Sequence, residues 1–221
     1  MMKRIETIAD MVKQGVIAAD IGTDHAFLPV LLIRSGRCEK VYACDIAEGP
    51  LEAARKNIAK NGMQEQIIPV LSDGFDRVPA DADAAVLAGM GYYTAADILT
   101  RAAERLDGMK QIIVEVNRNV REMRTWISDR NYTVIDERTV YERGFDYVII
   151  SFNTRRHDSY NEKELLCGPI LMRRRDEEYL AFVQRKITSL QKRLAKIPDT
   201  SSPAYAEGEK ELAMYWSVLH E

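Results

Sequence analysis

The 221-residue sequence predicts an α/β fold followed by a helical appendage. Three observations support this prediction. Short apolar runs alternate with segments of helical periodicity over residues 1–153, four of these runs end in an acid or a glycine, and apolar residues recur at steps of three and four from 180 to 197. We therefore expect a Rossmann-like domain at 1–153 and a helical, coiled-coil-like domain at 154–221.

Helices and strands alternate through the first half of the chain. Helical periodicity predicts helices near 3–13, 26–34 and 49–61. Buried strands are predicted at 16–20, 41–46 and 67–71. Pro69 places the third strand at an edge of the sheet, because proline has no N–H to donate to a neighbouring strand.

The second half of the sheet domain continues this alternation. Strands are expected at 84–88 and 111–116, each followed by a helix, and Thr94 is the expected cap of the first helix. Strands at 133–135 and 145–152 are joined through Arg143-Gly144, which is typical of a hairpin, so the last strand should be antiparallel. Seven strands with this ending match a class I methyltransferase better than an all-parallel dehydrogenase.

The composition changes after residue 153. Residues 153–161 are polar and basic, which is typical of a linker, and a long charged segment follows Gly168-Pro169. A turn at 198–203 separates two expected helices, which should form an antiparallel hairpin stabilised by the sheet domain or by a second copy. The apolar seam of the first helix consists of Leu180, Val183, Ile187, Leu190, Leu194 and Ile197.

The appendage is basic, although the whole chain has a formal net charge of −3. Residues 155–196 contain 11 Lys and Arg against 6 Asp and Glu. Such a segment is either a nucleic-acid-binding surface or the solvated face of a charged helix, and both interpretations stay open. The RNA-binding candidates are Arg155, Arg156, Arg173, Arg174, Arg175, Arg185, Lys186, Lys192 and Arg193.

Composition argues against several classes of protein. The chain has no run of eighteen apolar residues and no apolar region of a secretory signal near its start, so we expect neither membrane association nor export. The three cysteines lack zinc-site spacing and the three histidines are scattered, so no metal site is expected. We expect a cytoplasmic protein that is a monomer or a weak dimer.

The most informative stretch is residues 16–25, where an apolar strand ends in Asp20-Ile-Gly-Thr-Asp24. The complete Gly-x-Gly-x-x-Gly of a nicotinamide site is missing, and Asp24 stands where a second glycine would approach a pyrophosphate. Two carboxylates beside one glycine suit a cationic ligand without phosphate, such as S-adenosylmethionine. The alternative is an ordinary strand–helix turn with a capping aspartate.

The carboxyl ends of parallel strands meet at one edge of a sheet, where ligands bind. Asp45, 25 residues after Asp20, is suitably spaced to bind ribose hydroxyls, and Asp73 is a candidate partner for the adenine amino group. Together these strand ends could hold S-adenosylmethionine, with S-adenosylhomocysteine as the product. The cofactor-binding candidates are Asp20, Gly22, Thr23, Asp24, Asp45, Ile46, Asp73, Gly74, Ala88 and Gly89.

Four motifs are distinctive: Asp20-Ile-Gly-Thr-Asp-His-Ala-Phe-Leu-Pro29, Glu48-Gly-Pro-Leu-Glu-Ala-Ala-Arg-Lys-Asn57, Ser72-Asp-Gly-Phe75 and Ala88-Gly-Met-Gly91. Together with segments 144–149 and 168–171 they resemble the bacterial tRNA (adenine-22-N1) methyltransferase family, TrmK, over essentially the whole chain. The resemblance implies a Rossmann-like methyltransferase domain, a coiled-coil-like domain for tRNA, and methyl transfer from S-adenosylmethionine to N1 of a D-arm adenine.

The chain departs from the family pattern at three places on the side expected for the target base. Tyr92 replaces the last glycine of Gly-Met-Gly-Gly, Phe27 replaces a tyrosine, and Glu115-Val116-Asn117 replaces Gln-Pro-Asn. The acids expected on the cofactor side all match the family.

Methylation at N1 of adenine does not require a general base first, because neutral adenine carries a lone pair there. Catalysis should come from positioning and from negative potential around a flipped-out base. Tyr92 or Tyr93 could stack on the base or simply pack where the helix begins. His25 could orient the substrate or cap the start of its helix. Asn117 could hold the target base or simply terminate its strand. The positioning candidates are His25, Gly89, Met90, Gly91, Tyr92 and Asn117.

Two other functions remain open at this point. A related methyltransferase could act on another RNA position or on a small molecule. A binding module could retain the cofactor fold and use its hairpin to hold RNA or protein. Tyr92 bears on the second alternative, because a bulky side chain there could close the substrate pocket.

Overall fold

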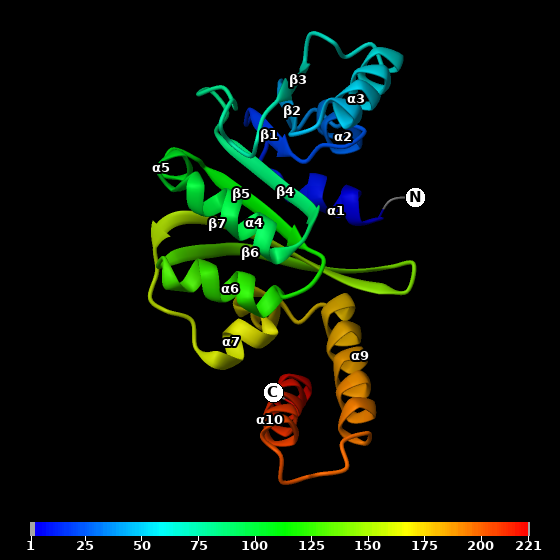
Figure 1. The fold of residues 1–221 in the computed structure, drawn as a ribbon, viewed down its shortest axis with the longest axis vertical. Helices are drawn as coiled ribbons and strands as arrows, with labels where there is room; N and C mark the ends of the chain where they lie inside the picture. Colours follow the sequence, from blue (N-terminus) through cyan, green and yellow to red (C-terminus); the bar gives the residue numbers. More distant parts are fainter. Residues whose placement is uncertain (1–2, 221) are drawn as a thin grey trace.

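The computed structural model describes residues 3–220, which form a seven-stranded sheet with helices on both faces (Figure 1). The strand order is β3-β2-β1-β4-β5-β7-β6, in which β1 to β5 are parallel and β7 is antiparallel to both of its neighbours. The predicted Rossmann-like sheet is confirmed, and Pro69 lies in an edge strand. The strands are β1 (Ala18–Ile21), β2 (Val41–Asp45), β3 (Ile67–Leu71), β4 (Ala84–Met90), β5 (Gln111–Val116), β6 (Tyr132–Glu142) and β7 (Phe145–Arg156).

Each face of the sheet buries an apolar core against its own set of helices. One face is covered by α1 (Lys3–Met11), α2 (Phe27–Arg34) and α3 (Glu48–Lys60). The other is covered by α4 (Tyr92–Arg101), α5 (Ala103–Leu106), α6 (Val120–Asp129) and the C-terminal helices. Because β1 pairs with both β2 and β4, the chain reverses its direction of progress across the sheet at the carboxyl end of β1, which is where ligands bind in sheets of this kind.

Strand β4 is two residues longer than predicted because it contains a bulge. Gly89 has a φ of +78° and is the extra residue in the ladder between β4 and β5. Glycine adopts this φ without steric cost. The prediction of Thr94 as a helix cap was wrong, because α4 begins at Tyr92 with Gly91 as its N-cap residue.

The β6–β7 hairpin is also longer than predicted. Its pairing runs from Tyr132–Arg156 to Glu142–Phe145 around the Arg143-Gly144 turn. Backbone pairing continues past the short apolar runs, because the ladder is formed by main-chain N–H and C=O groups, which every non-proline residue carries. Residues 153–156 therefore belong to β7, and their assignment to a linker was wrong.

The C-terminal helices follow β7. Short helices α7 (Glu162–Cys167) and α8 (Pro169–Arg174) lead to a hairpin of α9 (Glu177–Leu194) and α10 (Pro203–His220), which projects beyond β6 in Figure 1. A Cβ atom on Gly208 would lie 2.7 Å from Leu194 Cδ2, so the glycine allows α10 to approach α9 closely. The predicted seam is buried at Val183, Ile187, Leu190 and Leu194 and half-buried at Leu180 and Ile197.

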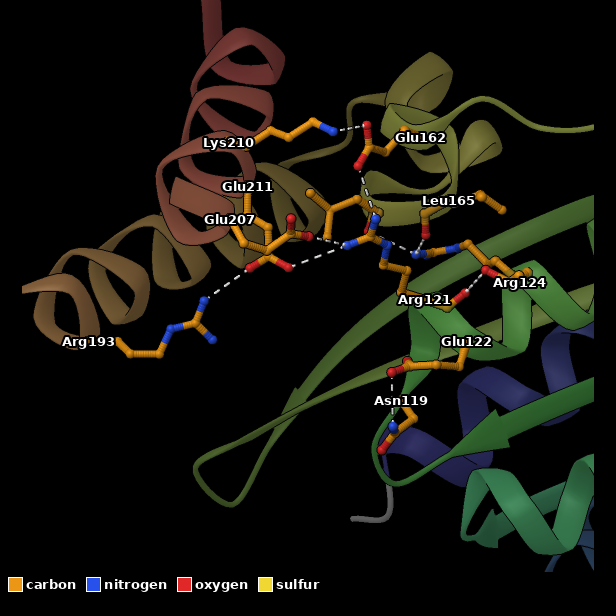
Figure 2. Close-up of polar contacts among 12 residues, drawn as sticks. Asn119, Arg121, Glu122, Arg124, Glu162, Leu165, Arg193, Glu207, Lys210 and Glu211 are labelled. Atoms are coloured by element: carbon orange, nitrogen blue, oxygen red, sulfur yellow. Dashed lines mark hydrogen bonds and ion pairs between the residues drawn. The ribbon is translucent and has the colours of Figure 1, made fainter. Parts of the chain in front are cut away.

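A buried ion pair joins these helices to the sheet. Arg124 Nε of α6 donates to Glu137 Oε1 of β6 at 2.7 Å, and both side chains are at most 3% exposed. Arg124 Nη1 also donates to the carbonyls of Leu165 and Leu166 at 3.1 and 3.0 Å (Figure 2). Glu137 Oε2 accepts from Ile170 N at 2.9 Å. The pair therefore satisfies backbone groups at the end of α7 and the start of α8.

Removing the cation of this pair should destabilise the whole fold. Arg124→Met leaves a buried, unpaired carboxylate and should lower the free energy of unfolding by about 3–5 kcal/mol in urea titrations followed by circular dichroism. The control Arg55→Met breaks an exposed pair with Glu48, also 2.7 Å long, and should leave the free energy of unfolding nearly unchanged, because solvent screens exposed ion pairs. Equal effects of the two substitutions would contradict the anchoring role of Arg124.

Candidate active site

The loop after β1 is folded tightly onto the end of β2. The N–H groups of Gly22 and Thr23 donate to the carbonyl of Cys44 at 2.8 and 2.9 Å, and Thr23 Oγ1 donates to Asp20 Oδ2 at 2.7 Å. Gly22 has a φ of +80°, and a Cβ atom there would lie 3.4 Å from Met90 Cε. These hydrogen bonds hold the turn in place. Gly22, which has no side chain, faces Met90 at the end of β4.

Asp20 is a buried carboxylate without an ion pair to any residue between 3 and 220. Burial raises the pKa of its carboxyl to about 6; the Thr23 hydroxyl lowers this pKa, and the Asp45 carboxylate raises it further. A cationic ligand would compensate for the lost solvation, whereas a phosphate would be repelled by both acids. The site therefore fits the ammonium and sulfonium groups of S-adenosylmethionine rather than a dinucleotide.

Asp45 ends β2 at the same edge. Its Oδ1 accepts from Ala47 N at 2.9 Å, which fixes the carboxylate and leaves Oδ2 without a donor in the described chain. The neighbouring Ile46 side chain is 68% exposed, so it offers an apolar surface at the strand end. A fixed acid beside an exposed apolar side chain suits a ribose and its attached base.

Asp73 and Gly74 lie at the end of β3, and each has a local contact. Asp73 Oδ1 forms an ion pair with Arg101 Nη2 of α4 at 2.8 Å. A Cβ atom on Gly74, which has a φ of +55°, would lie 2.8 Å from Ile98 Cγ2, so this glycine is needed for the packing of α4. Asp73 retains Oδ2 for a ligand.

Asp24 and His25 lie on the exposed rim of the site. Their side chains are 71% and 50% exposed, and His25 Nε2 is 3.6 Å from Asp24 Oδ1. The His25 ring lies 5.4 Å from the ring of Phe27. Neither residue caps the following helix, because its N-cap residue is Ala26 and no side chain bonds there.

The target-base candidates gather around the β4 bulge. Asn117 fixes this segment from the end of β5, since its Nδ2 donates to Gly89 O and its N–H donates to Met90 O, both at 3.1 Å. From the other side of the bulge, Gly89 N donates to Glu115 Oε2 at 3.0 Å. The N–H of Gly89 is thus already bonded, so this donor is not free to contact an adenine edge. Ala88, the last residue before the bulge, is half-buried.

The two tyrosines after the bulge differ in environment. Tyr92 is half-buried against the core at the start of α4, whereas Tyr93 is 80% exposed. Their rings meet edge to face at 5.1 Å. Tyr92 therefore supports the exposed ring, and Tyr93 is the better placed of the two for stacking.

A groove of about 560 Å³ lies between the β5–α6 loop and the helical hairpin. It begins at Asn117, next to the bulge, and its lining includes Arg118 and Lys186. Neither cation forms an ion pair with any residue in the described chain. The Lys186 Nζ lies 5.0 Å from the centre of the Phe182 ring. The groove therefore connects the target-base candidates with free positive charge.

Most of the arginines predicted to bind RNA are engaged within the protein. Arg173 Nε donates to Pro169 O at 3.1 Å, Arg174 bonds Asp136 and the carbonyl of Glu137, and Arg175 bonds the carbonyl of Val218. The Arg173 bond lies within α8, whereas the bonds of Arg174 and Arg175 attach the root of the hairpin to β6 and to the end of α10. Arg185 pairs with Asp146 at 2.6 Å. Arg155, Arg156 and Lys192 are exposed and form no ion pair with residues 3–220.

A network of ion pairs lines the junction between α6 and α10 (Figure 2). Arg121 contacts Glu162, Glu207 and Glu211 at 3.1, 3.3 and 3.6 Å. Arg193 shares Glu211 at 3.1 Å, so this RNA-binding candidate is already paired. The network fixes α10 beside the groove and neutralises part of its charge.

Sequence reasoning missed Arg4, Arg118 and Arg121, and it did not give Glu115 a role. Arg4 Nη1 of α1 pairs with Glu115 Oε2 of β5 at 2.6 Å. A usable signal was present for Glu115, because a charged residue inside an otherwise apolar strand must find a partner. The partner itself, 111 residues away, has no sequence signal.

Within residues 3–220, no group of three or more His, Cys, Asp or Glu side chains is placed to hold a metal ion. None of the helices in this part of the chain is both long enough and apolar enough to cross a membrane.

Comparison with known proteins identifies the family. Residues 18–215 match the family model TrmK, tRNA (adenine(22)-N(1))-methyltransferase. The tRNA (adenine(22)-N(1))-methyltransferase of Bacillus subtilis strain 168 is 28% identical over 99% of this chain and 95% of its own length. The structure of M. capricolum TrmK with S-adenosylhomocysteine has a TM-score of 0.84 and 26% identity, covering 100% of this chain and 98% of that one.

A Streptococcus pneumoniae protein in complex with S-adenosyl-L-methionine has a TM-score of 0.87 and 25% identity over the full length of both chains. The similarity thus includes the sheet, the strand ends and the C-terminal helices. The chain belongs to the tRNA (adenine(22)-N(1))-methyltransferase family, TrmK.

Proposed function

We propose that this chain transfers the methyl group of S-adenosylmethionine to N1 of adenine 22 in tRNA, with the donor at the carboxyl ends of β1 to β3. Family membership makes it an S-adenosylmethionine-dependent tRNA methyltransferase. The observation that supports the site is that Asp20 is buried without a cationic partner in the described chain. It lies close to Asp45 at the carboxyl end of β1, where the order of the strands reverses. A paralogous or non-catalytic function is not favoured, because the family match includes both the base side and the hairpin.

Different donor-side residues contact different parts of S-adenosylmethionine. The Asp20–Thr23 turn faces the methionine half, Asp45 binds the ribose hydroxyls, and Ile46 with Asp73 contacts the adenine. When bound, S-adenosylmethionine supplies an electrophilic methyl group on its sulfonium. The remaining candidates, Asp24 and His25, are exposed on the rim and contact the donor or substrate from outside.

The base-side residues position the target adenine. Asn117 and the Gly89–Gly91 segment form the floor, and Tyr93, supported by Tyr92, offers a face for stacking. The N1 lone pair attacks the methyl group directly, so no side chain has to remove a proton before attack. The product base is cationic, and the acids at this edge favour its formation electrostatically.

The proposed second domain, 154–221, which begins with the last residues of β7 and is helical from α7 on, contributes to tRNA binding through the groove. Arg118 and Lys186 are proposed to contact phosphates next to the flipped-out nucleotide, with Lys192, Arg155 and Arg156 further along the surface. Arg174 and Arg175 act chiefly by holding the hairpin in place, whereas the exposed Arg173, whose bond lies within α8, remains an RNA-binding candidate. We propose that the protein acts in the cytoplasm, where tRNA is found, as a monomer or a weak dimer.

The reaction is tested with unmodified tRNA and labelled S-adenosylmethionine. We expect N1-methyladenosine at position 22 and no product from the same tRNA with guanine at that position. Asp45→Ala should raise the KM for the donor about 10–100-fold, the effect of removing a hydrogen bond to a charged group, and should leave the site of methylation unchanged. Methylation at another nucleotide would contradict the assigned target.

Donor affinity should depend on pH through Asp20. Its carboxyl is ionised above about pH 6, and only the ionised form attracts the cationic donor. Calorimetry should show constant affinity well above that pH and a loss approaching tenfold per pH unit below it. In Asp20→Asn the affinity should be weaker and nearly flat across the same range. A parent protein whose affinity does not change with pH would exclude this role.

The groove should bind tRNA electrostatically. Arg118→Ala and Lys186→Ala each remove a cation from it, and for every phosphate that is no longer neutralised the slope of log affinity against log salt should fall by about 0.7–0.9. Donor binding should not change. Lys56→Ala on α3, on the opposite face of the sheet, is the matched control and should leave the slope unchanged. An unchanged slope in both groove variants would show that tRNA binds elsewhere.

A further inference from the structure

Glu115 is a charged residue in a strand that is otherwise apolar. Its side chain is 0% exposed, and it follows Ile112, Ile113 and Val114 in β5. Oε2 accepts from both Arg4 Nη1 at 2.6 Å and Gly89 N at 3.0 Å, whereas Oε1 is buried without a partner in the described chain. Burial raises the pKa of the Glu115 carboxyl, while the Arg4 guanidinium and the Gly89 N–H lower it.

This arrangement is a poor way to stabilise a sheet. A buried ion pair contributes little net stability compared with apolar side chains of similar volume, and an unpaired buried oxygen is unfavourable. The carboxylate nevertheless accepts a hydrogen bond from the backbone N–H of Gly89, the extra residue of the bulge. Its clearest effect is therefore local, on the conformation of Gly89.

The bulge is held from both sides by residues of one tripeptide. Glu115 binds the N–H of Gly89, and Asn117 binds the carbonyls of Gly89 and Met90. The Met90 side chain in turn reaches the position of a Cβ on Gly22, in the donor loop, at 3.4 Å. A small shift of Gly89 would therefore move the floor of the base site relative to the donor.

Arg4 connects the β4 bulge to α1. Its guanidinium lies 5.0 Å from the centre of the Tyr147 ring in β7, and its Nη1 is 3.6 Å from the position of a Cβ on Gly89. The guanidinium of this α1 residue thus lies between β7 and the bulge, where it compensates the negative charge of Glu115.

We propose that Glu115 and Arg4 are positioning residues for methyl transfer, which fix the Gly89 bulge and so align the target adenine with the donor methyl group. This role rests on the proposed function. Neither residue contacts the donor-side acids, so their loss should affect kcat and leave the affinity for S-adenosylmethionine unchanged.

The test measures kcat, the KM for tRNA and the donor dissociation constant in a set of variants. Glu115→Ala removes the acceptor of the Gly89 N–H and should lower kcat by about 10–100-fold, as a small misplacement of reacting groups does, with a donor affinity within about twofold of the parent. Glu115→Gln keeps an oxygen that can accept this bond and should lose less. Arg4→Gln should be impaired because it leaves the carboxylate unpaired, and the double variant Arg4→Gln/Glu115→Gln should recover part of that loss.

Lys3→Gln is the matched control, because Lys3 lies beside Arg4 on α1 and forms an exposed 2.7 Å pair with Glu178. It should leave kcat unchanged. An active parent whose kcat is unaffected by Glu115→Ala would overturn the positioning role alone. A parallel fall of kcat and donor affinity in every variant, without recovery in the double variant, would also overturn it in favour of a purely structural role. A parent that binds the donor but methylates no tRNA would instead overturn the proposed function and this role with it.

Discussion

A charge buried in a protein interior must be compensated, and three acids of this sheet meet that requirement in different ways. Glu137 is paired with Arg124, which also satisfies backbone carbonyls at the end of α7. Glu115 is paired with Arg4. Asp20 has no cation in the described chain, and burial raises its pKa to about 6. The first two are compensated by the fold itself, whereas the third is suited to compensation by a cationic ligand.

The same need for compensation explains the C-terminal helices. Their sequence is rich in arginine, but Arg174 and Arg185 bond groups of β6 and β7, and Arg175 joins the end of α8 to α10. Attachment of this kind is needed because a two-helix hairpin buries too little apolar surface to be stable alone. Of the cations without an ion pair in the described chain, Arg118 and Lys186 line the groove that starts at Asn117, whereas Arg155, Arg156 and Lys192 lie outside its lining.

On the base side of the site, one residue that departs from the family pattern adds a negative charge, and a nearby residue compensates that charge. Glutamate replaces glutamine in the tripeptide 115–117 at the end of β5, and the added negative charge is matched by a guanidinium from α1. The neighbouring tyrosine at the start of α4 does not fill the edge of the sheet, because its ring packs against the core and a second tyrosine remains exposed. These substitutions keep the backbone of the β4 bulge in place and change the side chains around it.

The sequence by itself determined the sheet, the order of its elements and the acids at its ligand edge. Apolar periodicity identifies the parallel strands, and the carboxyl ends of such strands meet at one edge in any sheet of this kind, so Asp20, Asp45 and Asp73 had to be neighbours. The lengths of β4, β6 and β7 were underestimated, because backbone pairing continues where side-chain hydrophobicity stops.

Only the tertiary structure decided what each charge does. Arg4 and Glu115 are 111 residues apart, and Arg124 and Glu137 meet only because α6 packs over β6 beside the end of α7. Whether an arginine binds a carbonyl, a carboxylate or solvent depends on which groups the folded chain brings within about 3 Å of it. Local sequence patterns carry no information about those distances, so the partners of buried charges and the free cations of the groove became visible only in the fold.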